Sequence, residues 1–118
     1  MKGTSPNAQE KIYWDLLARV VGCIACRHDG VFNDYVSIHH INGRTRSGCH
    51  KDVLPLCAQH HQHDDTDPAG RTGVHPFKAR FEQKYGDSMT LNSECNRILT
   101  EHGYTVGWLR QSAIKYLI

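Results

Sequence analysis

The sequence has little excess charge of either sign and no long apolar run. Its 118 residues carry 14 Lys or Arg and 12 Asp or Glu, which gives a formal net charge of +2. A chain so close to neutral does not attract nucleic acid over its whole surface, so any contact with phosphates must come from a local basic patch. No apolar stretch approaches the length of a membrane span, and we expect no membrane partner.

The N-terminus, MKGTSPNAQEK, also lacks an apolar run of the kind found in signal peptides. The chain has five cysteines, an odd number, and disulfides are rare in the cytosol. We therefore expect a cytoplasmic protein whose cysteines bind metal. A single domain of this length buries only a modest core, and a structural metal would stabilise it.

Histidine, by contrast, is abundant, and six of the nine histidines lie within residues 36–65. Residues 36–41 alternate β-branched and polar side chains and residues 53–56 form a second short apolar run, so both are predicted strands. Residues 57–65 fit a polar helix. Strand, loop, strand and helix, with histidines on the first strand and the helix, are the parts of a ββα-metal (HNH) nuclease site. We predict an α+β fold: a small zinc-stabilised ββα-metal domain with flanking helices.

The rest of the chain is predicted to surround this motif. Residues 1–6 form a loose tail, and residues 7–118 form one domain with its core motif at 22–75 and helices over 76–118. Apolar residues three or four apart indicate helices, and a stretch rich in Gly, Asp and Thr indicates a loop. The predicted helices are 7–21, 75–85, 89–102 and 104–118, and the predicted loop is 66–73.

Two pairs of residues with matching spacing predict a structural zinc site. Cys23 and Cys26 have two residues between them, and so have Cys57 and His60. Zinc prefers four such ligands in a tetrahedron, and two pairs supply them. The alternatives are ordinary buried cysteines or a redox pair, but a second matching pair favours zinc.

His39 and His40 are the candidate catalytic residues. A metal-dependent nuclease needs ligands for a divalent metal and a general base that activates water, and a neutral histidine suits either role. In a regular strand the two side chains would point to opposite faces, so the hypothesis requires the strand to twist or end here, before the Asn42-Gly43 turn. The alternative is one histidine in the core and one on the surface.

Further metal ligands are expected near the helix at 57–65. His61 points about 100° away from His60 around a helix, towards the strands. Its partner could be Asp64, Asp65 or His75, although a solvated acidic patch is the preferred explanation of the two aspartates. His63 is expected to be exposed.

The remaining cysteines and histidines have weaker patterns. Cys49 and His50 are adjacent and so poorly placed to act as nucleophile and base, which leaves a supplementary metal role or loop anchoring open. Cys95 is expected to be a small buried hydrophobe. His28 and His102 fit no pattern, and a place near a helix C-terminus explains His102.

Three segments, CIACRHDG, VSIHHINGRTRSGCHKDVLPLCAQHHQH and VHPF, resemble the Ref family of phage RecA-dependent HNH nucleases, over roughly residues 22–75. The resemblance implies a ββα-metal fold with zinc, and DNA cleavage where RecA filaments have formed in a bacterial host cell. It implies that His40 is the general base, that His39 faces the metal, and that His75 belongs to the active site. An HNH motif usually has an asparagine before the second strand that helps to hold the base, and Asp52 is the nearest equivalent here. The long basic segment that precedes the domain in Ref is not present in this sequence, which has Lys2 and Lys11 there.

The leading hypothesis is a metal-dependent DNA endonuclease with a structural Zn²⁺ and a catalytic Mg²⁺, Mn²⁺ or Zn²⁺. His40 would activate water, and His39, His61 and His75 would hold the catalytic metal. The alternative is a non-catalytic, zinc-finger-like module that binds DNA or protein. In either case the loop cations would contact phosphates: Arg44, Arg46 and Lys51. A thiol-redox protein lacks the βαβ setting expected for its motif. A second metal site, formed by histidines that converge on one point, would favour the enzyme.

Overall fold

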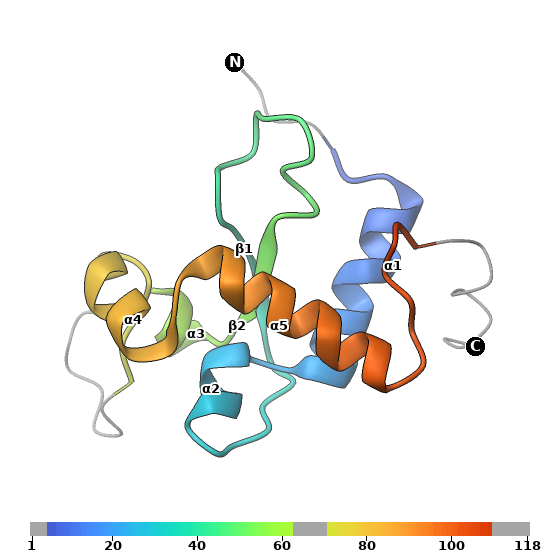
Figure 1. The fold of residues 1–118 in the computed structure, drawn as a ribbon. Coiled ribbons are helices and arrows are strands. Elements are labelled where there is room, and N and C mark those ends of the chain that lie inside the picture. Colours follow the sequence, from blue (N-terminus) through green and yellow to red (C-terminus); the bar gives the residue numbers. More distant parts are fainter. Residues whose placement is uncertain (1–4, 63–70, 110–118) are drawn as a thin grey trace.

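The computed structural model describes residues 5–62 and 71–109, and in it helices pack around a small two-stranded antiparallel sheet (Figure 1). This is a small mixed α/β architecture, as the sequence predicts. The described elements are, in chain order, α1 Ala8–Leu16, the π-helical turn η1 Leu17–Val21, α2 Ile24–His28, β1 Ser37–His40, β2 Val53–Leu56, α3 Ala58–His61, α4 Lys78–Tyr85 and α5 Ser88–Glu101.

The sheet is short, and its two strands differ in burial. β1 pairs with β2 so that His39 lies opposite Leu54 and His40 opposite Val53. All four residues of β2 are buried, because α5, α2 and η1 pack against this strand. α5 crosses β2 in Figure 1, while the β1–β2 loop extends away from the helices. The side chains of β1 are less buried, so the strand with the two histidines is the one nearer solvent.

α1 begins with a capping box, in which the Asn7 side chain accepts from the Glu10 amide and the Glu10 side chain accepts from the Asn7 amide. The helix continues to Val21, as predicted, but its last turn widens to a π-helix. It ends at Gly22, which has a φ of +68°. A Cβ at this position would lie 2.7 Å from the Asn33 carbonyl oxygen, so only glycine fits without a shift. The close approach lets the Cys23 amide donate to the same oxygen.

α5 packs against β2. Its N-cap is Asp87, whose carboxylate accepts from the amides of Met89 and Thr90. The buried Asn92 amide donates to the carbonyls of Lys51, at 3.2 Å, and Val53, at 2.9 Å. These bonds hold the start of β2 against the helix, and they fix the end of the β1–β2 loop.

Several predicted boundaries differ from those in the structure. The helix predicted at 57–65 is the single turn of α3, which ends before Gln62, and residues 63–65 lie outside the described residues. The helix predicted from His75 begins at Lys78 instead. His75 is held in a bridge with Gln62, and its amide donates to the His61 carbonyl, so its backbone is extended rather than helical.

The predicted helix at 104–118 is wrong over residues 104–109, which are not helical; residues 110–118 lie outside the described part of the chain. After α5 the Tyr104 amide donates to the Leu99 carbonyl, closing the helix end. Val106 and Leu109 are buried, and Trp108 packs edge-on against Tyr13. Apolar residues three apart reach the core here through turns, so their spacing gave a false helical signal. No helix among the described residues is both long and apolar enough to cross a membrane.

Candidate metal centres and active site

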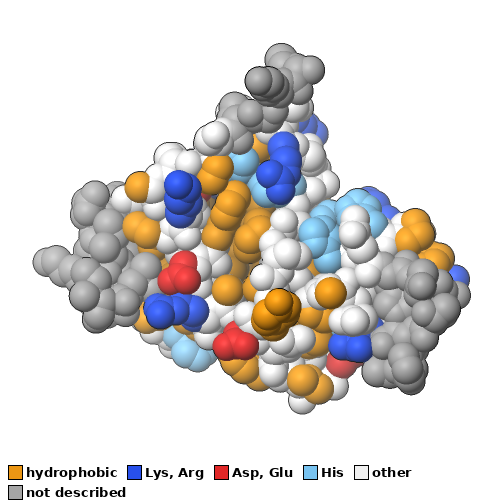
Figure 2. All heavy atoms as spheres, turned by 180° about the vertical axis from the view of Figure 1, so that it is seen from behind, with side chains coloured by type: hydrophobic (Ala, Val, Ile, Leu, Met, Phe, Trp, Pro, Cys, Tyr) orange, Lys and Arg blue, Asp and Glu red, His pale blue; other side chains and the backbone are white. Residues whose placement is uncertain are grey.

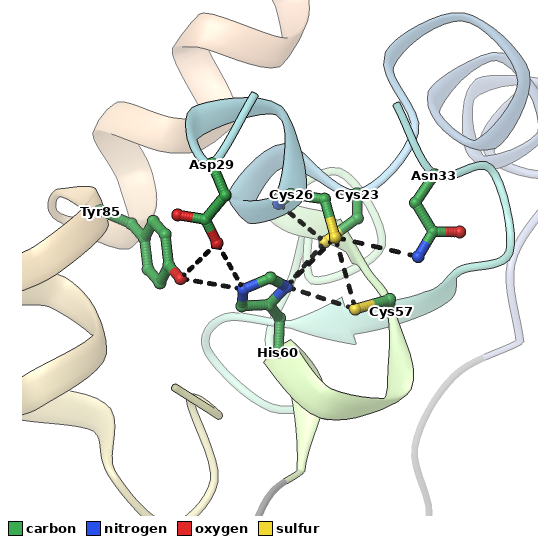
Figure 3. Close-up of polar contacts among 7 residues, drawn as sticks. All are labelled: Cys23, Cys26, Asp29, Asn33, Cys57, His60 and Tyr85. Carbon is green, nitrogen blue, oxygen red and sulfur yellow. Dashed lines mark hydrogen bonds and ion pairs between the residues drawn. The ribbon is translucent and has the colours of Figure 1, made fainter. Parts of the chain in front are cut away.

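The first cluster joins two helix N-termini. Cys23 caps α2, and its Sγ accepts from the Cys26 amide. Cys57 is the N-cap residue of α3, and His60 lies within that turn. Nδ1 of His60 is 3.4 Å from Sγ of Cys23, 3.5 Å from Sγ of Cys26 and 3.2 Å from Sγ of Cys57 (Figure 3). All four residues are at most 4% exposed.

These four residues fit a tetrahedral metal site. Their ligand atoms all lie within 4.8 Å of one another, and Sγ of Cys26 is 3.7 Å from Sγ of Cys57. Ligands about 2.3 Å from a tetrahedral zinc are separated by about 3.8 Å. That separation is far longer than a disulfide bond, and all five cysteines are free of disulfides. The cluster could therefore hold a metal such as zinc.

The electrostatics of the cluster favour a thiolate. A hydrogen bond from the Cys23 thiol, and then the contact with His60, lower the pKa of Cys57 to about 3. The same bond to Cys57, together with burial, raises the pKa of Cys23. Metal ligation requires deprotonated sulfur, and Cys57 is a cysteine of the cluster whose pKa is lowered.

A second layer of side chains orients His60. Its Nε2 lies 2.9 Å from the Tyr85 hydroxyl and 3.3 Å from Oδ2 of Asp29, and the hydroxyl donates to Asp29 at 2.8 Å. With Nε2 directed at these oxygens, Nδ1 is left to face the sulfurs, as in many metal sites. Asn33 also donates to Sγ of Cys26. Sequence reasoning missed these three residues. Of the three, only Asp29 could have been found from the sequence, because it lies three residues after the ligand Cys26.

The second cluster contains histidines alone: His39 from β1, His61 from α3, and His75. Their ligand nitrogens lie within 4.8 Å of one another, and the ring centroids are 5.1 to 5.8 Å apart. The backbone bridge between Gln62 and His75 holds the last two side by side. His39 is buried, His61 half-buried and His75 exposed, so the cluster is closed towards the core and open to solvent. A metal held here would keep positions for water or substrate, as catalytic sites require.

Two histidines of this cluster, His39 and His61, are prepared to act as neutral ligands. Burial, followed by the neighbouring His61 and His75, lowers the pKa of His39 to about 4. Burial also lowers the pKa of His61. Nδ1 of His61 lies 2.7 Å from the Ser37 hydroxyl, which leaves Nε2 of this ring for a metal.

His40 is directed differently from His39. β1 ends at His40, as the hypothesis required, and the half-buried ring of His40 lies against His50, with Nε2 3.0 Å from Nδ1 of His50. Burial, followed by the charge of Arg44, lowers the pKa of His40 to about 4. The ring is therefore neutral near pH 7, in the protonation state that a general base needs.

The three-histidine cluster and His40 line one open cleft, with a volume of about 350 Å³. The residues around it are Ile38, His39, His40, Ile41, Gly43, Arg44, His61 and His75. Figure 2 shows histidine side chains reaching the surface in two neighbouring groups on the face opposite that of Figure 1, with a Lys or Arg side chain directly against one group. A substrate in this cleft would meet both His40 and the three-histidine cluster.

The loop cations occupy three different environments. Arg44 is exposed and lines the cleft, and Arg46 is exposed in the same loop. Lys51 instead lies over the Trp108 ring, 4.7 Å from its centroid. Arg44 and Arg46 are therefore the better-placed contacts for a phosphate backbone.

The structure separates the other candidates from both clusters. Asp52 is hydrogen-bonded through its backbone: its carbonyl accepts from the Ile41 amide, and its amide donates to the Gly48 carbonyl. His50, from the loop, contacts the ring of His40 instead. His28 pairs with Glu94 on the surface, and His102 lies against the C-terminus of α5. Cys95 lies in the core, as expected. Asp64, Asp65 and His63 are outside the described residues.

Fold and site together define a small mixed α/β protein with a buried cysteine–histidine cluster that could hold a metal, and a histidine cluster at a surface cleft. The chain belongs to the recombination enhancement, RecA-dependent nuclease family, whose family model matches residues 6–100. This confirms the family resemblance inferred from the sequence motifs. The match extends well beyond residues 22–75, from the capping box of α1 almost to the end of α5, so both clusters and the helices that support them lie within it.

Proposed function

We propose that this protein is a metal-dependent DNA endonuclease of the HNH class, with β1, β2 and α3 as its ββα motif. The observation that carries the proposal is the convergence of His39, His61 and His75 on one cleft, with His40 beside them. A binding module of the zinc-finger type needs only the first cluster. Four histidines around an open cleft, in a chain of a nuclease family, have a direct use in phosphodiester hydrolysis.

The residues divide the work as follows. His39, His61 and His75 would hold a divalent metal, whether Mg²⁺, Mn²⁺ or Zn²⁺, which when bound polarises a phosphate and stabilises the departing oxygen. His40 accepts a proton from the attacking water, because its ring is neutral near pH 7. Arg44, at the rim of the cleft, and Arg46 contact the DNA backbone. Cys23, Cys26, Cys57 and His60 would hold a structural zinc.

The setting follows from the family and the charge. A net charge of +2 gives weak, salt-sensitive binding to naked DNA. A RecA filament would deliver the enzyme by adding a second contact, which raises the local concentration without changing the active site. We place this activity in recombination, in the cytoplasm of a bacterial cell that carries a phage or prophage.

The test is a plasmid-nicking assay with each divalent metal, with and without RecA and nucleotide, at physiological salt. We expect slow nicking of free DNA and faster nicking when RecA filaments cover part of the substrate. His40→Ala should lower the rate on the order of 10²–10⁴-fold, with unchanged zinc content, melting temperature and DNA affinity. His102→Ala, a histidine distant from the cleft, is the matched control and should nick at the wild-type rate.

The outcomes separate the parts of the proposal. A His40→Ala protein that nicks at the wild-type rate would refute the role of His40. A wild-type protein that binds DNA but never nicks it, under any metal, would favour the non-catalytic module. A rate that RecA leaves unchanged or lowers would remove RecA as the delivering partner and leave the nuclease chemistry in place.

A further inference from the structure

The loop between β1 and β2 contains one buried histidine to which the proposed chemistry gives no role. His50 is only 3% exposed, although the loop residues 42–48 are all exposed. Its Nδ1 lies 3.0 Å from Nε2 of His40, and the two rings meet nearly at right angles, with centroids 5.1 Å apart. This is hydrogen-bond geometry between two imidazoles.

Trp14 of α1 fixes this pair from the other side. Its indole lies edge-on to both rings, with centroids 5.5 Å from His40 and 5.5 Å from His50. The indole Nε1–H donates to the His50 carbonyl at 2.9 Å. His50 is thus held through its backbone by a helix and through its ring by His40. These contacts fix His50, directly beside the proposed base, although the tip of the same loop is exposed.

A general base needs a neighbouring residue that holds its ring in one orientation. His40 is the last residue of β1, so the sheet restrains its backbone on one side only. Its side chain can rotate about two bonds, and each wrong orientation moves the nitrogen lone pair away from the water. Reactions of this kind lose rate steeply when a reacting group is displaced by about 1 Å. A partner that fixes the ring plane therefore supports catalysis without touching the substrate.

We infer that His50 is the positioning residue for His40, held in place by Trp14. The inference rests on the proposed function, because it assigns His50 a role through His40. It also replaces Asp52, the nearest equivalent of the asparagine that holds the base in an HNH motif, which is hydrogen-bonded here through its backbone. His50 orients the ring and keeps its lone pair directed into the cleft.

The test is a double-mutant cycle of His40→Ala and His50→Ala in the nicking assay with RecA filaments. We expect His50→Ala to lower kcat on the order of 10–100-fold, with KM and DNA affinity within about twofold of wild type. In the His40→Ala background the same substitution should have no further effect, because its only route to the reaction is gone. His50→Asn, whose amide can still bond to the ring, should recover part of the rate.

Two further variants separate positioning from loop packing. Cys49→Ala removes a neighbouring buried side chain from the same loop and should nick at close to the wild-type rate. Trp14→Phe keeps an aromatic ring and removes the donor to the His50 carbonyl, and should lower kcat severalfold. Should His50→Ala not fold, as judged by its melting curve and zinc content, His50→Asn and Trp14→Phe decide the question.

The results distinguish failure of the inference from failure of the proposed function. Nicking that depends on His40 but not on His50, or losses that simply add in the double variant, would overturn the positioning role alone. Equal losses in Cys49→Ala and His50→Ala would also overturn it, in favour of loop packing. Nicking that does not depend on His40 would overturn both. A ring ¹⁵N NMR spectrum adds an independent check, since His50→Ala should change the His40 signals even in the absence of DNA.

Discussion

Loss of one ligand of the buried cysteine–histidine cluster should cost this protein its fold. Cys57→Ala is the sharpest perturbation, because Cys57 lies between β2 and α3 and its Sγ contacts Nδ1 of His60 at 3.2 Å. The substitution removes the thiol with the lowest pKa of the cluster. It leaves two sulfurs and one imidazole around a space that is closed to water.

The expected loss of stability follows from comparing the binding free energy of a structural zinc with the stability of a small domain. Structural zinc sites contribute about 10–16 kcal/mol of apparent binding free energy, whereas a domain of this size has a total stability of about 5–15 kcal/mol. Loss of even a third of the metal's contribution removes about 3–5 kcal/mol, which is comparable to the whole stability of a marginal domain. The cluster also ties α2 to α3, elements more than thirty residues apart in sequence, so no local contact replaces it.

The measurement is native mass spectrometry for zinc content, combined with thermal unfolding. Cys57→Ala should purify with less than one zinc and melt roughly 10–30 °C lower, or without a cooperative transition. Cys95→Ala is the matched control, because Cys95 is equally buried but lies in the core on α5. It should keep its zinc and lose only about 1 kcal/mol. Equal zinc content and equal melting curves for the two variants would refute the structural metal site.

Two further predictions concern the surroundings of the clusters. Tyr85→Phe removes the hydroxyl that bonds to His60 and Asp29, and should weaken zinc binding about tenfold in a chelator competition, whereas Tyr13→Phe, a buried tyrosine away from the cluster, should not. Burial lowers the pKa of His39 from its ordinary value near 6.5 to about 4, so between these pH values the unfolded chain binds the extra proton and stability rises with pH. The test is urea unfolding of wild type and His39→Gln at pH 7 and pH 4, without added divalent metal. The free energy of unfolding of wild type should fall by up to about 3 kcal/mol more than that of His39→Gln between these pH values. Parallel pH profiles of the two proteins would contradict the buried, neutral state of His39.

The sequence was sufficient to predict the elements that local chemistry defines. Alternating residues located the first strand, a short apolar run located the second, and apolar residues three or four apart located α1 and α5 closely. Spacing was also enough to group the four residues of the first cluster, since each pair lies within a single turn. The predictions fail where tertiary contacts determine the backbone conformation. The sequence predicts a helix that begins at His75, but the backbone of His75 pairs with Gln62.

The supporting residues could not be predicted for the same reason. Tyr85 is 25 residues from His60 in sequence, and its place on an apolar helix face indicates a core residue and nothing more. The partnership of His40 and His50 depends on how a loop folds back over Trp14. Sequence spacing identifies ligands that share a turn, but it does not identify the side chains that hold those ligands from another element.

The two clusters are not independent, because one short helix serves both. α3 has only four residues, far too few to be stable by itself. Consecutive residues on it point about 100° apart, so His60 enters the buried cluster while His61 faces the cleft. The amides of Val74 and His75 donate to the carbonyls of His60 and His61, which places His75 beside them. A metal bound at Cys57 and His60 would thus fix the turn that presents His61 and, through the bridge of Gln62 with His75, the position of His75. The buried cluster stabilises the fold and, by the same bonds, sets the geometry of the open one.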